Sequence, residues 1–379
     1  MKVHIFYLAV MDRQGDHITV GGIQNYLIGL GAALKEAGNE VRIYQGADKD
    51  FESTYNDINI IGKKNELKKS LKGQIKEVFH QVKDEIYPDD VVIFGTDKIA
   101  FKLKGYSKTI SIQHGISFDY ISYNAFPSFL KKNWIGTVYK WLQCYRNAKD
   151  FLICKNVVCV DYNFVNWIRT ILPRNYSEKT VVIPNYAIPS EKVSINLISH
   201  KSIKILFARR FEMMRGVYIL IDIVKEISSR YKNVEFTICG DGPLKEKLNQ
   251  ELGHFPNVLI TKYGIGESEK FNLEHHITLV PTYGSEGTSF SLLEGMAAGA
   301  VPIVSNVGGM TNIILDGYNG YIMNPHSENF IEKISFLIEN PDKLKEISGN
   351  TKKTVEASFN ETKWKQDWIN FVNKVYNAN

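Results

Sequence analysis

Short apolar runs alternate with helical stretches along the whole 379-residue chain. In the first half these runs are four to eight residues long, rich in β-branched side chains, and often continuously apolar. Strands of a parallel sheet that is covered on both faces have this pattern. The runs are KVHIFYLAV, EVRIYQ, INIIG, DVVIFG, KTISIQHG, NVVCVD and TVVIPN.

The second half repeats this arrangement of apolar runs and helical periodicity. Its apolar runs are IKILFARR, VEFTICGDG, NVLITKYG, ITLVPTYG, VPIVSNVGG and GYIMNP, and helical patterns such as GVYILIDIVKEISSRY and FIEKISFLIEN lie between them. Alternating strands and helices predict βαβ units. We therefore expect an α/β protein with two Rossmann-like, doubly wound domains facing a central cleft, where the carboxyl ends of the strands bind the ligand.

The length of the chain suits two domains. The polar segment 188–202 has no clear periodicity and predicts the joint, which gives domains of 1–190 and 191–357. Residues 358–379 predict a C-terminal amphipathic helix with Trp364, Trp368 and Phe371 on one face, which we expect to cross back to the N-terminal domain.

Composition narrows the class of protein. Hydrophobic residues make up 44% and charged residues 23%, as in globular proteins, and no run reaches the roughly 18–20 apolar residues of a membrane span. The N-terminal run predicts a first strand rather than a signal peptide. The four cysteines form no CxxC pair and have no zinc-site spacing, which indicates reduced thiols in a cytoplasmic protein.

The stretch EGTSFSLLEGMAAG, from Glu286 to Gly299, predicts a turn between a strand and a helix. A helix N-terminus of this kind suits a phosphate group. Glu286 and Glu294 cannot bind phosphate, but they can accept hydrogen bonds from hydroxyls on either side of it, as a nucleotide sugar would offer. The alternative is that Glu286 is a solvated loop acid and Glu294 a local capping residue.

The same stretch resembles the E-x7-E motif of retaining glycosyltransferases of the GT-B fold, in glycosyltransferase family 4 (glycosyl transferases group 1). Four further elements resemble this family in the expected order along the chain: the Gly21–Gly22 pair, IPN at 183–185, ILFARRFEMMRGVYILI, and FTICGDGPL. The resemblance implies an acceptor-binding N-terminal domain and a C-terminal domain that binds a nucleotide sugar.

The resemblance also implies roles for individual residues. Arg210 and Arg215 match the basic pair that neutralises the leaving diphosphate, and His114 matches a histidine near the reacting carbon of the sugar. With Glu286 these form the predicted catalytic set. The predicted donor-binding residues are Gly21, Gly22, Arg210, Arg215, Gly240, Tyr283, Glu286, Gly287, Thr288, Ser289, Phe290, Ser291 and Glu294. Arg209 stands where the family has glycine, and we interpret it as a surface residue, the alternative being a third phosphate contact.

The function implied by this resemblance is retaining transfer of a sugar from a nucleotide-diphosphate sugar to a hydroxyl. The acceptor would be a glycan or lipid-linked oligosaccharide of a bacterial surface polysaccharide such as lipopolysaccharide. The alternatives are a nucleotide-sugar epimerase, a phosphorylase, or a non-catalytic glycan-binding or chaperone-like protein of the same fold. We expect no cofactor and no metal, and interpret the DxD triplet Asp48–Asp50 as a solvated loop; no nucleic-acid motif is present.

Charge suggests a further partner. Residues 1–190 hold 25 Lys and Arg against 19 Asp and Glu, a net charge of +6, whereas residues 191–379 hold 21 against 22, a net charge of −1. Within the first half, the stretch 129–149 mixes basic residues with Trp134, Tyr139, Trp141 and Tyr145, which suits a helix at the surface of an anionic membrane. A second basic cluster lies at 63–76. The alternative is that the aromatic side chains belong to the core and the lysines to an ordinary solvated face.

Overall fold

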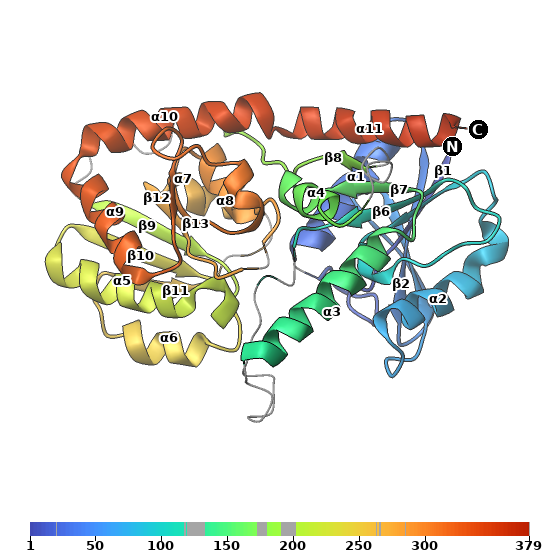
Figure 1. The fold of residues 1–379 in the computed structure, drawn as a ribbon, viewed down its shortest axis with the longest axis horizontal. Helices are drawn as coiled ribbons and strands as arrows, with labels where there is room; N and C mark the ends of the chain where they lie inside the picture. Colours follow the sequence, from blue (N-terminus) through green and yellow to red (C-terminus); the bar gives the residue numbers. More distant parts are fainter. Residues whose placement is uncertain are drawn as a thin grey trace. The chain divides into compact units, whose positions relative to one another are not determined.

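The fold comes from a computed structural model, which divides into two compact units (Figure 1). The first contains Met1–His114, Lys132–Pro184 and Thr362–Asn379, and the second contains Gly115–Lys131 and Asn185–Glu361. The structure describes residues 1–19, 21–116, 119, 133–172, 180–190, 202–262, 264, 267–284 and 286–378. Most of the predicted joint, residues 191–201, lies outside these ranges.

The first unit is built on an eight-stranded sheet with the order β3-β4-β2-β1-β5-β6-β7-β8. All neighbouring strands are parallel except β3 and β4, which form an antiparallel hairpin. The strands are β1 Lys2–Phe6, β2 Glu40–Ala47, β3 Phe51–Tyr55, β4 Ile58–Lys64, β5 Val91–Phe94, β6 Thr109–Gln113, β7 Asn156–Cys159 and β8 Thr180–Val182. Its helices are α1 Gly22–Glu36, α2 Leu71–Val82, α3 Asn133–Phe151, α4 Tyr162–Arg169 and α11 Glu361–Asn377, with short 3-10 turns η1 Lys83–Glu85 and η2 Asp97–Ile99.

The second unit is built on a six-stranded, all-parallel sheet with the order β11-β10-β9-β12-β13-β14. The strands are β9 Ile203–Ala208, β10 Val234–Cys239, β11 Val258–Thr261, β12 Ile277–Val280, β13 Val301–Ser305 and β14 Tyr321–Met323. The helices are α5 Val217–Arg230, α6 Lys245–Leu252, α7 Ser268–Leu273, α8 Phe290–Ala297, α9 Ser327–Glu339 and α10 Pro341–Ser358, with 3-10 turns η6 Met213–Arg215 and η7 Gly308–Asn312.

Two apolar clusters cover the faces of the second sheet. One joins its strands to α5, α6 and α9 through buried side chains such as Leu220, Leu248 and Ile334. The other contains Leu292, Leu293 and Met296 of α8. A sheet covered on both faces needs continuously apolar strands, which is the pattern of VPIVS and ITLV. The packing fixes α8 against the sheet and so positions the loop before it.

The C-terminal helix α11 belongs to the first unit (Figure 1). Its face of Trp364, Trp368, Phe371, Val372 and Val375 is buried. The indole N–H of Trp368 donates to the Tyr26 hydroxyl of α1 at 2.8 Å, and the Tyr26 ring stacks edge-on against Trp364. The predicted amphipathic face is therefore the face that packs.

The prediction of an α/β fold with parallel sheets in both halves is confirmed. Every apolar run named above contains a strand, but the sequence pattern missed β3, because FESTY alternates between half-buried and exposed positions and has no apolar core face. Trp134, Trp141 and Tyr145 of α3 are exposed, so the alternative that they belong to the core is wrong. Among the described helices, none combines the length and the hydropathy that a membrane span needs.

Candidate active site

The loop from β12 to α8 carries the two predicted glutamates. Ser289 caps α8, and its side chain accepts a hydrogen bond from the backbone N–H of Leu292 at 3.4 Å. Glu286 lies before this cap and Glu294 lies in the second turn of the helix. The backbone N–H groups at a helix start favour an anion.

Two arginines bind the carboxylate of Glu286. Arg209, directly after β9, and Arg215, in η6, each form an ion pair with its Oε2 atom. Arg209 also donates to the hydroxyls of Ser289 and Ser291, at 3.2 and 3.1 Å. Its side chain is only 5% exposed, so the expectation that Arg209 is a surface residue is wrong. It ties the end of β9 to the first turn of α8.

The neighbouring Arg210 is placed differently. Its side chain is 66% exposed, and its guanidinium lies 3.9 Å from the carboxylate of Glu212. Successive side chains of an extended segment point to opposite sides, so two adjacent arginines at a strand end do not face the same site. Within the described residues, the arginines brought together at Glu286 are Arg209 and Arg215.

The charges of this cluster favour an anionic ligand. Burial lowers the pKa of Arg209, and the adjacent Glu286 carboxylate opposes that change. A guanidinium nevertheless stays protonated in proteins, so the cluster holds two positive charges and one negative charge. Guanidinium groups held in place by ion pairs and serine hydroxyls can bind phosphate oxygens without first being ordered.

Glu294 has a different partner from Glu286. Its Oε2 accepts a hydrogen bond from the hydroxyl of Ser268, the first residue of α7, at 2.6 Å. Burial raises the pKa of Glu294, because it disfavours the charged carboxylate, and the Ser268 hydrogen bond works in the other direction. The glutamate thus has a fixed partner on one oxygen.

We expect the difference in free energy of unfolding between Glu294→Gln and wild type to shift in favour of the variant as the pH rises from 4 to 7. The folded-state pKa of Glu294 is above its unfolded value, so between the two values unfolding releases a proton and the wild-type free energy of unfolding falls with rising pH. Glutamine keeps the shape of the side chain but does not titrate.

The same substitution should lower the affinity for a nucleotide roughly 10–100-fold, because a hydrogen bond to a charged acceptor is lost.

Thermal melts of both proteins across this pH range test the expectation. The exposed Glu328 of α9 supplies the matched control, and Glu328→Gln should leave the pH dependence of wild type unchanged. A Glu294→Gln melting difference that is constant with pH would contradict the assignment.

Contacts with the backbone of neighbouring segments hold the Glu286 loop in place. Gly308 has a φ of +56°, and a Cβ there would overlap the carbonyl oxygen of Glu286. The backbone N–H of Gly309 donates to that same carbonyl at 3.1 Å. The amide of Asn185, in the IPN element, donates to the Thr288 carbonyl. Asn185 belongs to the IPN element that resembles the family motif, but its contact with the Glu286 loop could not be predicted from the sequence.

The remaining predicted donor residues lie at the same edge of the second sheet. Gly240 follows β10, and a Cβ there would overlap the carbonyl oxygen of Arg209. The backbone N–H of Tyr283, after β12, donates to the Met214 carbonyl at 3.0 Å. Phe290 packs edge-on against Tyr186. Gly287 follows Glu286, and its backbone lies against Gly309.

The predicted residues of the first unit lie at the carboxyl ends of its strands. Gly21 and Gly22 begin α1, and His114 follows β6. The Nε2 atom of His114 lies 2.7 Å from the carbonyl oxygen of Gly95, which can only accept, so Nε2 carries the proton. Burial lowers the pKa of His114 to about 4, so the imidazole is neutral at neutral pH.

A buried carboxyl that was not predicted from the sequence lies at this same edge. Asp97, after β5, is 1% exposed, and burial raises its pKa to about 7. Thr96 donates to one of its oxygens at 3.3 Å. An aspartate in the segment GTDKIA resembles any solvated loop acid, so no local signal reveals its burial.

The DxD triplet lies in the turn between β2 and β3. Asp48 pairs with Arg13 at 2.6 Å and Asp50 pairs with Lys63 at 3.0 Å, so both carboxylates have cationic partners. Among the residues that the structure describes, no group of three or more His, Cys, Asp and Glu side chains is placed to hold a metal ion. Independence from metal stays a prediction.

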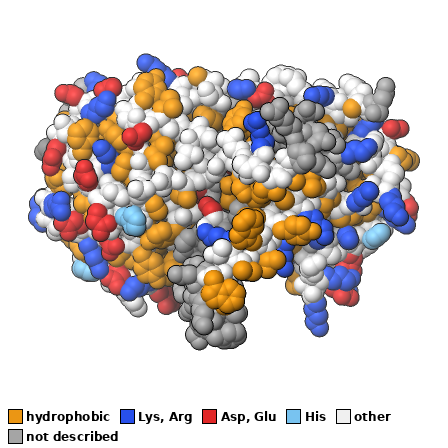
Figure 2. Space-filling view, viewed as in Figure 1, with side chains coloured by type: hydrophobic (Ala, Val, Ile, Leu, Met, Phe, Trp, Pro, Cys, Tyr) orange, Lys and Arg blue, Asp and Glu red, His pale blue; other side chains and the backbone are white. Residues whose placement is uncertain are grey.

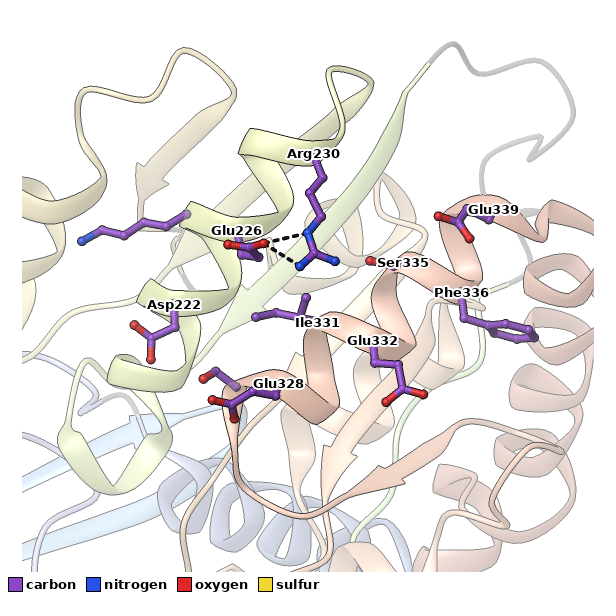
Figure 3. Close-up of a pocket in the computed structure, with 11 residues that line it drawn as sticks. Asp222, Glu226, Arg230, Glu328, Ile331, Glu332, Ser335, Phe336 and Glu339 are labelled. Atoms are coloured by element: carbon purple, nitrogen blue, oxygen red, sulfur yellow. Dashed lines mark hydrogen bonds and ion pairs between the residues drawn. The ribbon is translucent and has the colours of Figure 1, made fainter.

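A groove of about 870 Å³ lies elsewhere on the second unit, between α5 and α9 (Figure 3). It is lined by Asp222, Lys225, Glu226, Arg230, Ser327, Glu328, Ile331, Glu332, Ser335, Phe336 and Glu339. Glu226 pairs with Arg230 within the groove, and Lys225 pairs with Glu251. It contains none of the predicted site residues.

Parts of the chain are similar in sequence to known glycosyltransferases. Residues 190–354 match the family model described as glycosyl transferases group 1. An uncharacterized glycosyltransferase of Methanocaldococcus jannaschii is 30% identical over 202 residues, which cover 52% of this chain and 53% of that protein. The chain spans about half the length of several curated relatives that it matches.

Solved structures match over the whole chain. Sucrose-phosphate synthase of Thermosynechococcus elongatus has a TM-score of 0.76 at 14% identity, with complete coverage of both chains. Anabaena HepE, solved with UDP-glucose, has a TM-score of 0.71 at 15% identity and covers 99% of this chain and 100% of its own. Residues 190–354 are thus similar to glycosyl transferases group 1, and the chain as a whole has the GT-B fold.

Proposed function

We propose that this chain is a retaining glycosyltransferase of family 4 that transfers a sugar from a nucleoside-diphosphate sugar to a hydroxyl group. The observation that carries the proposal is the cluster of Arg209, Arg215 and Glu286 at the start of α8. It combines fixed cations for a diphosphate with a carboxylate for sugar hydroxyls. The family match of residues 190–354 and the UDP-glucose bound by HepE support the same ligand class.

In the proposed reaction the bond between the anomeric carbon and the β-phosphate oxygen breaks, and the acceptor oxygen forms a new bond to that carbon. The departing nucleoside diphosphate gains negative charge, which Arg209, Arg215 and the N–H groups of the α8 start stabilise. The acceptor hydroxyl attacks on the face of the leaving group and gives its proton to the departing phosphate. This route retains the anomeric configuration and assigns no nucleophile to the protein.

The two glutamates have different roles in this proposal. Glu286 has one oxygen held by two guanidinium groups, so its other oxygen can accept hydrogen bonds from the sugar. Glu294, held by Ser268, accepts hydrogen bonds from the ribose diol. The role first predicted for Arg210 passes to Arg209. The roles of His114 at the reacting carbon, and of Gly21 and Gly22 at the diphosphate, stay predictions.

We further propose that the acceptor is a glycan or lipid-linked oligosaccharide of a bacterial surface polysaccharide, at the inner face of the cytoplasmic membrane. This part of the proposal rests on the family resemblance and on the positive charge of the first half of the chain. No metal takes part, because the arginines and the helix start supply the positive charge.

A nucleotide panel tests the proposed function. UDP, GDP, ADP, dTDP, CMP and NAD are compared by thermal shift on wild type and on Arg215→Ala. A ligand at about 100 times its Kd adds about 2.7 kcal/mol to the free energy of unfolding, a shift of several degrees for a domain of this size. We expect one of the nucleoside diphosphates to raise the Tm of wild type and to leave the Tm of Arg215→Ala unchanged.

Transfer from sugars of that nucleotide then tests the chemistry. The product should keep the donor's anomeric configuration by proton NMR, and EDTA should leave the rate unchanged. An inverted anomer or a metal requirement would contradict the mechanism. Conversion of the donor without any acceptor would indicate an epimerase, and no nucleotide binding would favour a non-catalytic protein.

A further inference from the structure

Helix α3 of the first unit carries an exposed apolar face. Its members are Trp134, Val138, Trp141, Leu142 and Tyr145, and this spacing places them on one side of a helix. Trp134, Trp141 and Tyr145 are 65%, 73% and 68% exposed. Figure 2 shows hydrophobic side chains gathered over α3 on the face turned to the viewer. We call this group the apolar face of α3.

The opposite side of α3 is the side that packs. Gly136, Asn147 and Phe151 on that side are buried, and Ala148, at the C-terminal end of the apolar face, is buried as well. The helix is therefore anchored by small side chains and Phe151, while its largest side chains point away from the unit. Single exposed hydrophobic residues are ordinary on protein surfaces, but five together on one helix indicate an interaction surface.

The charges on α3 are almost all positive. The helix carries Lys140, Arg146 and Lys149, all exposed, against one carboxylate, Asp150. Asp150 is paired with Lys72 of α2 at 2.8 Å. The partner of the apolar face of α3 should therefore offer an apolar region to the aromatic side chains and negative charges to the basic ones.

We propose that the apolar face of α3 docks on a lipid surface that contains anionic headgroups. Tryptophan and tyrosine favour the interface between hydrocarbon and water, where the ring is buried and the polar atom stays hydrated. Basic residues beside them gain from the negative potential of the headgroups. This inference stands on α3 alone and does not depend on the proposed function.

A second copy of the chain fits this face less well. Two α3 helices packed through their apolar faces would bring Arg146 and Lys149 of both copies close together. The single carboxylate of each helix is already paired with Lys72. Like charges in such an arrangement repel, whereas an anionic membrane supplies the opposite charge.

Vesicle sedimentation of the full chain tests the proposal. We expect the chain to sediment with vesicles of phosphatidylcholine containing roughly one-third phosphatidylglycerol, and at least about tenfold more weakly with phosphatidylcholine alone. Trp134→Ser/Trp141→Ser should lower partitioning about tenfold or more, because the apolar contact is lost. Arg146→Glu/Lys149→Glu should remove the preference for anionic vesicles. Brominated lipid should quench wild-type tryptophan fluorescence.

Matched controls separate this face from general surface effects. Leu315→Ser removes an exposed apolar side chain from the second unit, and Lys102→Glu/Lys104→Glu makes an equal charge change elsewhere on the first unit. Both should bind vesicles as wild type does. The proposal is overturned if wild type stays in the supernatant with both vesicle types, or if the double serine variant binds as wild type. It is also overturned if light scattering shows a dimer that this variant dissociates.

Discussion

Arg209→Met is expected to lower kcat for sugar transfer by about 10²–10³-fold, the usual effect of removing one preorganised donor from a developing negative charge. Arg209 contacts Glu286, Ser289 and Ser291, so the substitution removes a cation from the start of α8 and frees the carboxylate of Glu286. Arg209→Lys should recover part of the rate, because it keeps the charge but loses the bidentate geometry. Steady-state kinetics with the nucleotide sugar found in the panel measures all three proteins.

The neighbouring Arg210 is the matched control for this prediction. Its side chain is 66% exposed, so Arg210→Met should change kcat no more than a few-fold. Circular dichroism and a thermal melt check that each variant is folded. If Arg210→Met abolished transfer while Arg209→Met did not, Arg210 would be the cation at the diphosphate and the role proposed for Arg209 would be refuted.

Trp368→Ala is expected to lower the free energy of unfolding by about 3–5 kcal/mol, the cost of removing a buried aromatic side chain. The indole is fully buried, and its N–H donates to the Tyr26 hydroxyl at 2.8 Å. For a domain of about 150–250 residues each kcal/mol shifts Tm by about 2–4 °C, so the first unit should melt roughly 10 °C lower. Differential scanning calorimetry measures this transition.

The exposed face of the same helix provides the control. Asn373→Ala on α11 should change the free energy of unfolding by less than about 0.5 kcal/mol. A Trp368→Ala transition within about two degrees of wild type would show that α11 contributes little to the first unit, whatever the contacts of Trp368.

The strands could be predicted from the sequence because most of them are buried on both faces. A short β-branched apolar run such as VVIF or ITLV favours a strand buried on both faces, and both form strands of the parallel sheets. The hairpin strand β3 could not be predicted in this way. FESTY lies at the edge of its sheet, where partial exposure removes the apolar signal.

The grouping of the candidate site residues could be predicted where they are close in the sequence. Glu286, Ser289, Ser291 and Glu294 lie in one strand-to-helix segment, as the motif predicted, and their roles stay predictions. Arg209 and Arg210 show the limit of this approach. Adjacent side chains at a strand end point to opposite sides, so a motif aligned one residue out of register selects the exposed Arg210 instead of Arg209, which binds Glu286. Charge and residue type are identical at both positions, and only burial distinguishes them.

Contacts between distant segments were beyond prediction for a different reason. Ser268 binds Glu294 from 26 positions away, and Asn185 binds the Thr288 carbonyl from 103 positions away. Neither residue type carries a signal for such a partner. The approach of Gly308 to Glu286 likewise depends on two loops meeting at the edge of the second sheet.

The return of α11 to the first unit has a consequence for how the protein is made. The first unit takes its strands from the beginning of the chain, but its Trp368 face is translated only after the whole of Asn185–Glu361. At about 5–20 residues per second, the α1 surface around Tyr26 therefore stays uncovered for many seconds on the ribosome. During that interval the second unit can complete its own core. The first unit, whose synthesis begins first, therefore completes its core last.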